Sequence, residues 1–288
     1  MKTMFIKIAA RLSGARKCVA ERATALKDAT YPGQPASVPR SSSVPDFSPV
    51  ITDYWTAAFS GKTLHRNEHV TITVKPYLDH DERAAILRSP DDKLASVTVS
   101  PAVADALIKD IATRGSPTAA DIRAALATQG VVLNDAANVF YLSESAADDI
   151  LGEAASTDVR PLTSRDAEIF ASFKAAVPER DWDEAYVELD HWAVFGAFDG
   201  HGRLVSIGSI YPWDDEFPLA DAGVLTLDSA RGRGHAKTLV RAMFRYALTQ
   251  GFEPQYRCQL DNAASIKLAA SVNLQQFGQW ETVMPDDA

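Results

Sequence analysis

Short segments in which apolar and polar residues alternate are separated by segments in which apolar residues recur every three or four positions. The first pattern predicts half-buried strands, and the second predicts helices with one buried face. In the first part of the chain the predicted strands are residues 69–76, 93–99 and 139–142, and the predicted helices are residues 100–112 and 117–129. We therefore expect a small mixed α/β unit between residues 51 and 152.

The same patterns continue from residue 153 to residue 288, which we expect to form a second, larger unit. Its predicted strands are residues 159–162, 192–198, 203–211, 223–227, 255–260 and 279–283, and its predicted helices are residues 163–176, 235–249 and 263–272. Asp199-Gly200 predicts a hairpin, and Gly251 predicts the end of a helix. This order predicts an α/β (α+β) fold with a mixed central sheet flanked by helices.

The first 50 residues differ from the rest of the chain in composition. Apolar residues at helical spacing predict a basic helix over residues 1–29, whereas five prolines and a serine cluster predict a linker over residues 30–50. We expect this head to be disordered. A presequence, a secretion signal, a membrane-surface helix and an extension without a role are all compatible with its basic character.

Charge and cysteine usage narrow the class of protein. The chain has 29 Lys and Arg against 38 Asp and Glu, a net charge of −9, which argues against nucleic-acid binding. It contains no apolar run of the roughly 18 residues that a membrane span needs. Cys18 lies in the basic head and Cys258 in a predicted core strand, so we expect no disulfide and a reducing, cytoplasmic location.

The most informative segment is a strand followed by Arg231-Gly232-Arg233-Gly234-His235-Ala236 and then a helix. Gly232 and Gly234 can adopt positive φ, and the amides that open the helix have no partner within it. Such a turn binds phosphate groups. It lacks the G-x-x-x-x-G-K-[ST] spacing of a P-loop, and Lys237 stands where a dinucleotide-binding turn needs its third glycine.

This turn resembles motif A of the GNAT N-acetyltransferase superfamily, Arg/Gln-x-x-Gly-x-Gly/Ala. Asn262 and Ser265 downstream are similar to the superfamily's Asn-x-x-Ser/Ala segment, and the order of elements matches over about residues 158–284. The unit before it resembles a degenerate GNAT half, as in two-part members of the superfamily. The resemblance implies acyl transfer by a GNAT fold that is preceded by a smaller GNAT-like unit.

The resemblance also implies which residues hold acetyl-CoA. Its pantetheine arm would pair with a strand that splays from the next strand, its pyrophosphate would lie on the amides of the turn, and the asparagine segment would bind from the other side. The implied residues are Val224, Leu225, Thr226, Arg231, Gly232, Arg233, Gly234, His235, Ala236, Asn262 and Ser265. The amine of the acceptor would then attack the thioester directly, without a covalent enzyme intermediate.

The catalytic groups depart from the superfamily's pattern. Ala269 occupies the position of the tyrosine that protonates the leaving thiolate in many relatives, and Ser265, Ser271, Tyr256 or water are the alternatives. Four carboxylates precede or flank the cofactor strand and are candidates for the general base, namely Glu188, Asp190, Glu216 and Asp221. We place Glu188 and Asp221 first.

Several alternatives remain open at the level of sequence. A small amine, an amino acid, an antibiotic or a protein lysine would each serve as acceptor, and the oligomeric state is undetermined. A non-catalytic acyl-CoA-binding or regulatory protein is the main rival, because the tyrosine is missing. A secreted effector is a third possibility, motivated by the basic head. His65 and His69 do not match a zinc motif, so we expect no metal.

Overall fold

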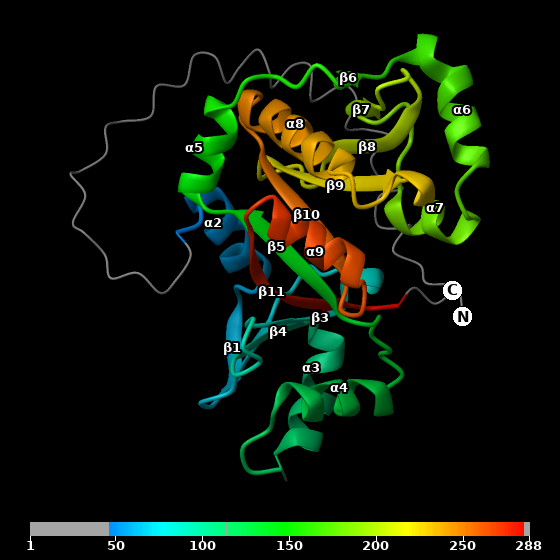
Figure 1. The fold of residues 1–288 in the computed structure, drawn as a ribbon. Coiled ribbons are helices and arrows are strands. Elements are labelled where there is room, and N and C mark those ends of the chain that lie inside the picture. The colour runs from blue at the N-terminus through cyan, green and yellow to red at the C-terminus, as the bar shows by residue number, and fades with distance from the viewer. Residues whose placement is uncertain (1–45, 113, 285–288) are drawn as a thin grey trace, which may run out of the picture.

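A computed structural model describes residues 46–112 and 114–284, which form a single mixed sheet flanked by helices (Figure 1). The strands are β1 (Lys62–Arg66), β2 (Val70–Val74), β3 (Ala84–Arg88), β4 (Ala95–Val99), β5 (Ala137–Leu142), β6 (Val159–Pro161), β7 (Ala193–Phe198), β8 (Leu204–Pro212), β9 (Leu219–Thr226), β10 (Glu253–Gln259) and β11 (Leu274–Thr282). The helices are α2 (Pro49–Ala58), α3 (Pro101–Ile111), α4 (Ala119–Thr128), α5 (Glu144–Gly152), α6 (Ala167–Ala175), α7 (Glu179–Ala185), α8 (His235–Thr249) and α9 (Ala263–Ser271), with short 3-10 turns η3 (His80–Glu82), η4 (Ser164–Asp166) and η5 (Asp228–Ala230).

The sheet continues across the domain boundary that the sequence predicts at residues 152 and 153. Its strand order is β1-β2-β4-β3-β11-β5-β10-β9-β8-β7-β6. The C-terminal strand β11 lies between β3 and β5, and β5 pairs with β10, so each part of the chain contributes a strand to the other part's side of the sheet. The division into two domains therefore stays a prediction, and the backbone ladder joins its two parts.

Two sets of helices cover the two faces of the second part of the sheet. On one face α5, α8 and α9 bury an apolar cluster that includes Met243 and Phe244 of α8. On the other face α6 and α7 pack through Phe170 and Trp182 against Val194 of β7 and Ile207 of β8. Helices α3 and α4 cover β2, β3 and β4 with a separate cluster. This layering follows from the alternation of side chains along each strand.

The strong periodic segments were predicted closely. Helix α8 spans His235–Thr249 as expected, α3, α4 and α9 differ from expectation by only one or two residues at an end, and Gly251 ends α8 with a φ of 80°. The sequence missed β1, β3, α5, α7 and α2. The linker predicted over residues 30–50 was wrong at its C-terminal end, because α2 begins at Pro49. Proline is tolerated in the first turn of a helix, so Pro49 does not exclude it.

Helix α2 packs through aromatic residues onto the centre of the sheet. Trp55 is 4% exposed, stacks on Phe277 of β11 and donates from its Nε1 to the hydroxyl of Tyr141 on β5 at 2.9 Å. Phe47, just before the helix, also contacts Tyr141 and Phe277. The segment from Phe47 to the end of α2 is therefore part of the core. The predictions for residues 1–45 lie outside the described residues.

No helix within the described part of the chain has the length and apolarity to cross a membrane.

We expect Trp55→Ala to lower the free energy of unfolding by about 3–5 kcal/mol, because it removes a buried aromatic side chain and leaves a cavity. Urea denaturation of the full chain measures this value. Tyr77→Ala is the matched control, because the Tyr77 side chain is 93% exposed and its removal should cost less than about 0.5 kcal/mol. Equal effects of the two substitutions would contradict the core position of α2.

Candidate active site

Strands β9 and β10 are parallel neighbours that separate part-way along their length. Their register runs from Leu219↔Glu253 to Ala222↔Tyr256 and then stops, although both strands continue. On its other edge β9 stays paired with β8 as far as Thr226. One edge of β9 is thus unpaired beyond Ala222. The splay that the resemblance implies at Val224–Thr226 is present in the backbone.

The alternation of the β8–β9 ladder shows which backbone groups face this gap. Leu227 N donates to Val205 O at 3.0 Å. Because hydrogen-bonded pairs alternate along an antiparallel ladder, Gly223 and Leu225 direct their backbone groups toward β8. Val224 and Thr226 direct theirs toward β10, where the pairing has ended. The amide and carbonyl of Val224 and the amide of Thr226 are therefore open to a ligand with amide groups of its own.

The glycine turn lies at the end of β9 and leads into α8. Gly232 has φ 75° and Gly234 has φ 86°, which are conformations that only glycine adopts without strain. Among the described residues, the Arg231 amide donates to Asp228 O, and the next amide with a backbone acceptor is that of Thr238, which donates to Gly234 O. The amides between them are free, and the positive end of the α8 dipole adds to their attraction for an anion.

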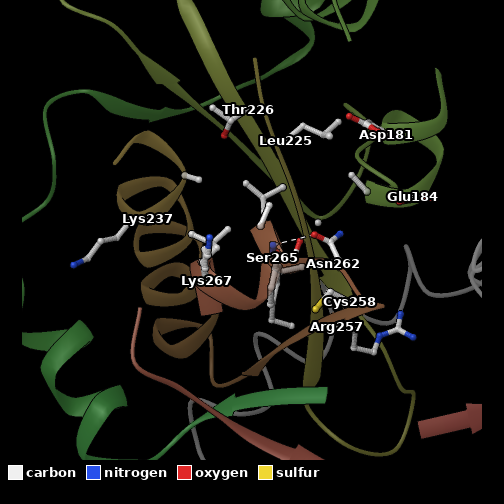
Figure 2. Close-up of a pocket in the computed structure, with 18 of the residues that line it drawn as sticks. Asp181, Glu184, Leu225, Thr226, Lys237, Arg257, Cys258, Asn262, Ser265 and Lys267 are labelled. Carbon is white, nitrogen blue, oxygen red and sulfur yellow. Dashed lines mark hydrogen bonds between the residues drawn. The ribbon is translucent and has the colours of Figure 1, made fainter. Parts of the chain in front are cut away.

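The asparagine segment opens α9 on the same side of the sheet. Asn262 is the N-cap, and its Oδ1 accepts from the Ser265 amide at 3.0 Å (Figure 2). Its capping role alone explains why asparagine stands there. Because Asn262 and Ser265 both also line the cavity described next, a ligand contact is compatible with that role.

A cavity of about 580 Å³ joins the gap between the strands to the glycine turn and to α9. All of the predicted CoA-binding residues line it except Arg233. Those that line it are Val224, Leu225, Thr226, Arg231, Gly232, Gly234, His235, Ala236, Asn262 and Ser265. Three segments that are far apart in the sequence therefore converge on one space.

Comparison with protein families agrees with this geometry. Residues 158–273 match the model of the acetyltransferase (GNAT) family. These residues form a GNAT acetyltransferase domain. Together with the mixed sheet and its flanking helices, this confirms the predicted fold class, whereas the degenerate GNAT character of the first part is not confirmed. No curated protein matches the chain.

Several solved GNAT structures are similar to this chain at low identity. A putative GNAT acetyltransferase from Novosphingobium aromaticivorans is 18% identical, with a TM-score of 0.40 over 52% of this chain and 64% of that one, which is slightly less than two thirds of its length. A GNAT acetyltransferase from Colwellia psychrerythraea is 16% identical, with a TM-score of 0.45 over 82% of this chain and 96% of that one. AAC(6')-Iy in complex with a CoA bisubstrate analogue is 22% identical, with a TM-score of 0.34 over 42% and 91%.

Asp221, one of the two carboxylates placed first as general base, lines the cavity of the GNAT domain but is fully engaged. It is 5% exposed and accepts from Arg257 Nε at 3.0 Å and Arg257 Nη2 at 2.7 Å. Gln255 Nε2 and the Tyr211 hydroxyl donate to it at 3.0 and 3.1 Å. Four donors occupy its oxygens, so its geometry suits a structural anchor better than a proton acceptor.

Glu188, the other carboxylate placed first, is half-buried in the loop after α7 and does not line the cavity. Asp190 and Glu216 do not line it either. Two carboxylates that sequence reasoning missed do line it, namely Asp181 and Glu184 of α7. The seven-residue helix α7 follows Pro178, and its charged sequence has no apolar stripe that would have revealed it.

Close backbone contact fixes α7 against β9. A Cβ added to Gly223 would lie 1.9 Å from the carbonyl oxygen of Ala185, so only glycine lets the end of α7 approach the strand. Tyr186 then ends the helix in the left-handed region, with φ 47°. Asp181 ties α7 to the glycine turn, because its Oδ2 lies 3.5 Å from Nη2 of Arg231. Helix α7 is thus the wall opposite α8 and α9.

Burial favours the protonated form of two side chains that line the cavity, the Tyr256 hydroxyl and the Cys258 thiol. Burial raises the pKa of the Tyr256 hydroxyl, which is hydrogen-bonded to Ser265. Burial also raises the pKa of the Cys258 thiol to about 11. Ala269, in the tyrosine position, is fully buried, whereas Tyr256, Ser265 and Ser271 all line the cavity. Within the described residues, no group of three or more His, Cys, Asp or Glu side chains could hold a metal.

Cys258 should react slowly with alkylating reagents in the folded protein. Its raised pKa leaves about one thiol in ten thousand ionised at pH 7, and only the thiolate reacts. In a Cys18→Ser background, the rate of reaction with iodoacetamide should rise about tenfold per pH unit up to about pH 10. A plateau near pH 8 would contradict the raised pKa, and the urea-unfolded protein is the control.

Proposed function

We propose that this protein is an N-acetyltransferase that transfers the acetyl group of acetyl-CoA to an amine. The observation that carries the proposal is the convergence of an unpaired strand edge, a turn of free amides and a helix N-terminus on one cavity. This combination suits a ligand with a pyrophosphate at one end and an amide-bearing arm at the other. Acetyl-CoA has both, and the family match supports acyl transfer.

In this proposal the chain holds acetyl-CoA in two ways. The free amides between Arg231 and Thr238 bind the pyrophosphate, and Lys237, which lines the cavity, adds positive charge beside it. The open backbone groups of Val224 and Thr226 pair with the pantetheine amides as a further strand would. Bound in this way, the thioester would lie in the gap between β9 and β10.

The protonated thiol of Cys258 supports direct attack by the amine in a ternary complex. Cys258 is the only cysteine among the described residues, and its raised pKa makes it a poor nucleophile. Catalysis then rests on holding the amine and the thioester close together and on removing a proton from the amine.

Tyr256 is the best-placed group to protonate the departing thiolate. It lines the cavity at the last position of β10 that pairs with β9, and its hydroxyl carries the proton that the thiolate needs. We assign to Tyr256 the protonation of the thiolate, which a tyrosine at the position of Ala269 performs in many relatives. The expected acceptor remains a small-molecule or peptide amine. The cytoplasmic location is a separate prediction, which comes from cysteine usage.

A non-catalytic acyl-CoA-binding protein is the alternative that one observation favours. Ala269 carries no acid and is fully buried, so the usual acid is absent from its usual place. The two functions differ in turnover. An enzyme releases CoA when acetyl-CoA and a suitable amine are both present, whereas a binding protein holds acetyl-CoA without releasing CoA.

Calorimetry with acetyl-CoA tests the proposed binding site. We expect the wild-type chain to bind acetyl-CoA, and Gly234→Ala to weaken binding at least about tenfold, because a side chain at φ 86° is strained and redirects the free amides. Gly200→Ala is the matched control, because a Cβ there meets nothing within 4 Å and φ is not positive. Absence of acetyl-CoA binding by the wild-type chain would refute the proposal.

Steady-state kinetics test the direct transfer. With a panel of primary amines that includes diamines, amino acids and aminosugars, CoA release should depend on both substrates in a sequential pattern. Cys258→Ser should keep at least about half of the wild-type rate, because a neutral buried thiol takes no part in the reaction. A ping-pong pattern that is lost in Cys258→Ser would show that the attack is not direct.

A further inference from the structure

Apart from Arg231 of the glycine turn and the Asp221–Arg257 pair of the strands, the Lys, Asp and Glu residues that line the cavity belong to helices on its two walls. Lys237 and Lys267 belong to α8 and α9, on the side where the proposed CoA-binding turn lies. Asp181 and Glu184 belong to α7 on the opposite side (Figure 2). In a ternary complex the amine has to approach from the side that CoA leaves free. That side is the α7 wall, which presents carboxylates.

Among the described carboxylates that line the cavity, Glu184 is the one whose partner is neither buried nor part of the glycine turn. Asp221 accepts four hydrogen bonds, two of them from Arg257. Asp181 pairs with Arg231, which belongs to the glycine turn. Within the described part of the chain, Glu184 pairs with Arg180, one turn earlier on α7, at 2.8 Å. The Arg180 side chain is 83% exposed, whereas that of Glu184 is 19% exposed. Because the Arg180 guanidinium lies in solvent, water screens this pair, and the Glu184 carboxylate can exchange Arg180 for another cation.

Close packing between the backbones of α7 and β9 holds Glu184 in position. Its neighbour Ala185 is the residue whose carbonyl touches Gly223 of β9. Gly223 is the first residue of β9 beyond the last pairing with β10, at Ala222. Glu184 is therefore fixed beside the point where the strands separate, which is where the proposed thioester would lie. Trp182, buried at 5% exposure two residues earlier, anchors the same helix.

We propose that Glu184 binds the acceptor as an ammonium ion and takes its proton, so that the enzyme selects amines that are cationic in solution. This inference rests on the proposed function. The Glu184 carboxylate accepts one proton from R–NH3+, and the nitrogen lone pair then forms the C–N bond to the thioester carbonyl carbon. The C–S bond breaks, and its electron pair leaves with sulfur. The thiolate takes a proton from the Tyr256 hydroxyl, the second proton lost by the nitrogen restores that hydroxyl, and Glu184 releases its own proton to solvent.

The test compares variants of α7 with the best amine found in the panel. We expect Glu184→Gln to lower kcat/KM by about 10² to 10⁴, the range typical of general acid–base catalysis, with KM for the amine raised at least tenfold. Its affinity for acetyl-CoA should stay within twofold of wild type, which shows that the variant is folded and its donor site intact. Glu184→Asp keeps the charge and should recover most of the loss in KM but less of the loss in kcat.

Two controls separate this role from a structural one. Asp183→Asn removes the same charge from the adjacent, exposed position of α7, which does not line the cavity, and should leave kcat/KM within twofold. Arg180→Ala removes the partner of Glu184 and should leave kcat/KM within threefold. An equal loss in Arg180→Ala and Glu184→Gln would overturn the inference, because it would assign the effect to the helix ion pair.

The remaining outcomes distinguish this inference from the proposed function. If the wild-type chain does not bind acetyl-CoA, the proposed function fails. If it transfers acetyl groups and Glu184→Gln retains kcat/KM within threefold, only the role of Glu184 is overturned. If the wild-type chain binds acetyl-CoA but releases CoA with no amine of the panel, the inference is also overturned and the non-catalytic alternative is favoured.

Discussion

The separation of β9 from β10 is the constraint on which the rest of the site depends. A parallel pair normally continues its ladder, because unpaired backbone groups in a protein interior are costly. Here the ladder stops at Ala222 and Tyr256, and the buried Asp221–Arg257 pair bridges the two strands next to that point. The Asp221–Arg257 pair therefore stabilises the sheet at the point where the open edge of β9 begins. The open edge creates the cavity and places backbone donors and acceptors along its wall.

The first part of the chain supports the site of strand separation from the face of the sheet opposite to α8 and α9. Trp55 of α2 donates to Tyr141, and Tyr141 is hydrogen-bonded to Gln255, which donates in turn to Asp221. The guanidinium of Arg257 lies 4.1 Å from the ring of Trp213, whose Nε1 donates to the Tyr54 hydroxyl on α2. Each polar group in this chain of contacts is buried or half-buried and has a partner, as a low-dielectric interior requires. Helix α2 thus helps to hold the strands of the GNAT domain in place.

Sequence reasoning was most successful where a local rule decides the structure. The glycines of the anion turn, the end of α8 at Gly251 and the amphipathic helix α8 itself each depend on neighbours within a few residues. It was less successful where partners are distant. Sequence reasoning placed Glu188 first and missed Glu184, because nothing local shows that Gly223 lets α7 approach β9 and that Glu184 rather than Glu188 then lines the cavity.

By itself, the sequence determined the donor half of the proposed site. The spacing of Arg231, Gly232, Gly234 and Asn262 depends on backbone conformation and helix ends, which are local properties. The tertiary structure alone decided which carboxylates line the cavity and that the sheet is continuous. Asp221 became an anchor because Arg257, Gln255 and Tyr211 converge on it, and β11 inserted between β3 and β5 because long-range pairing buried its edges. Such pairings join residues that no local pattern links, so they depend on the packed fold.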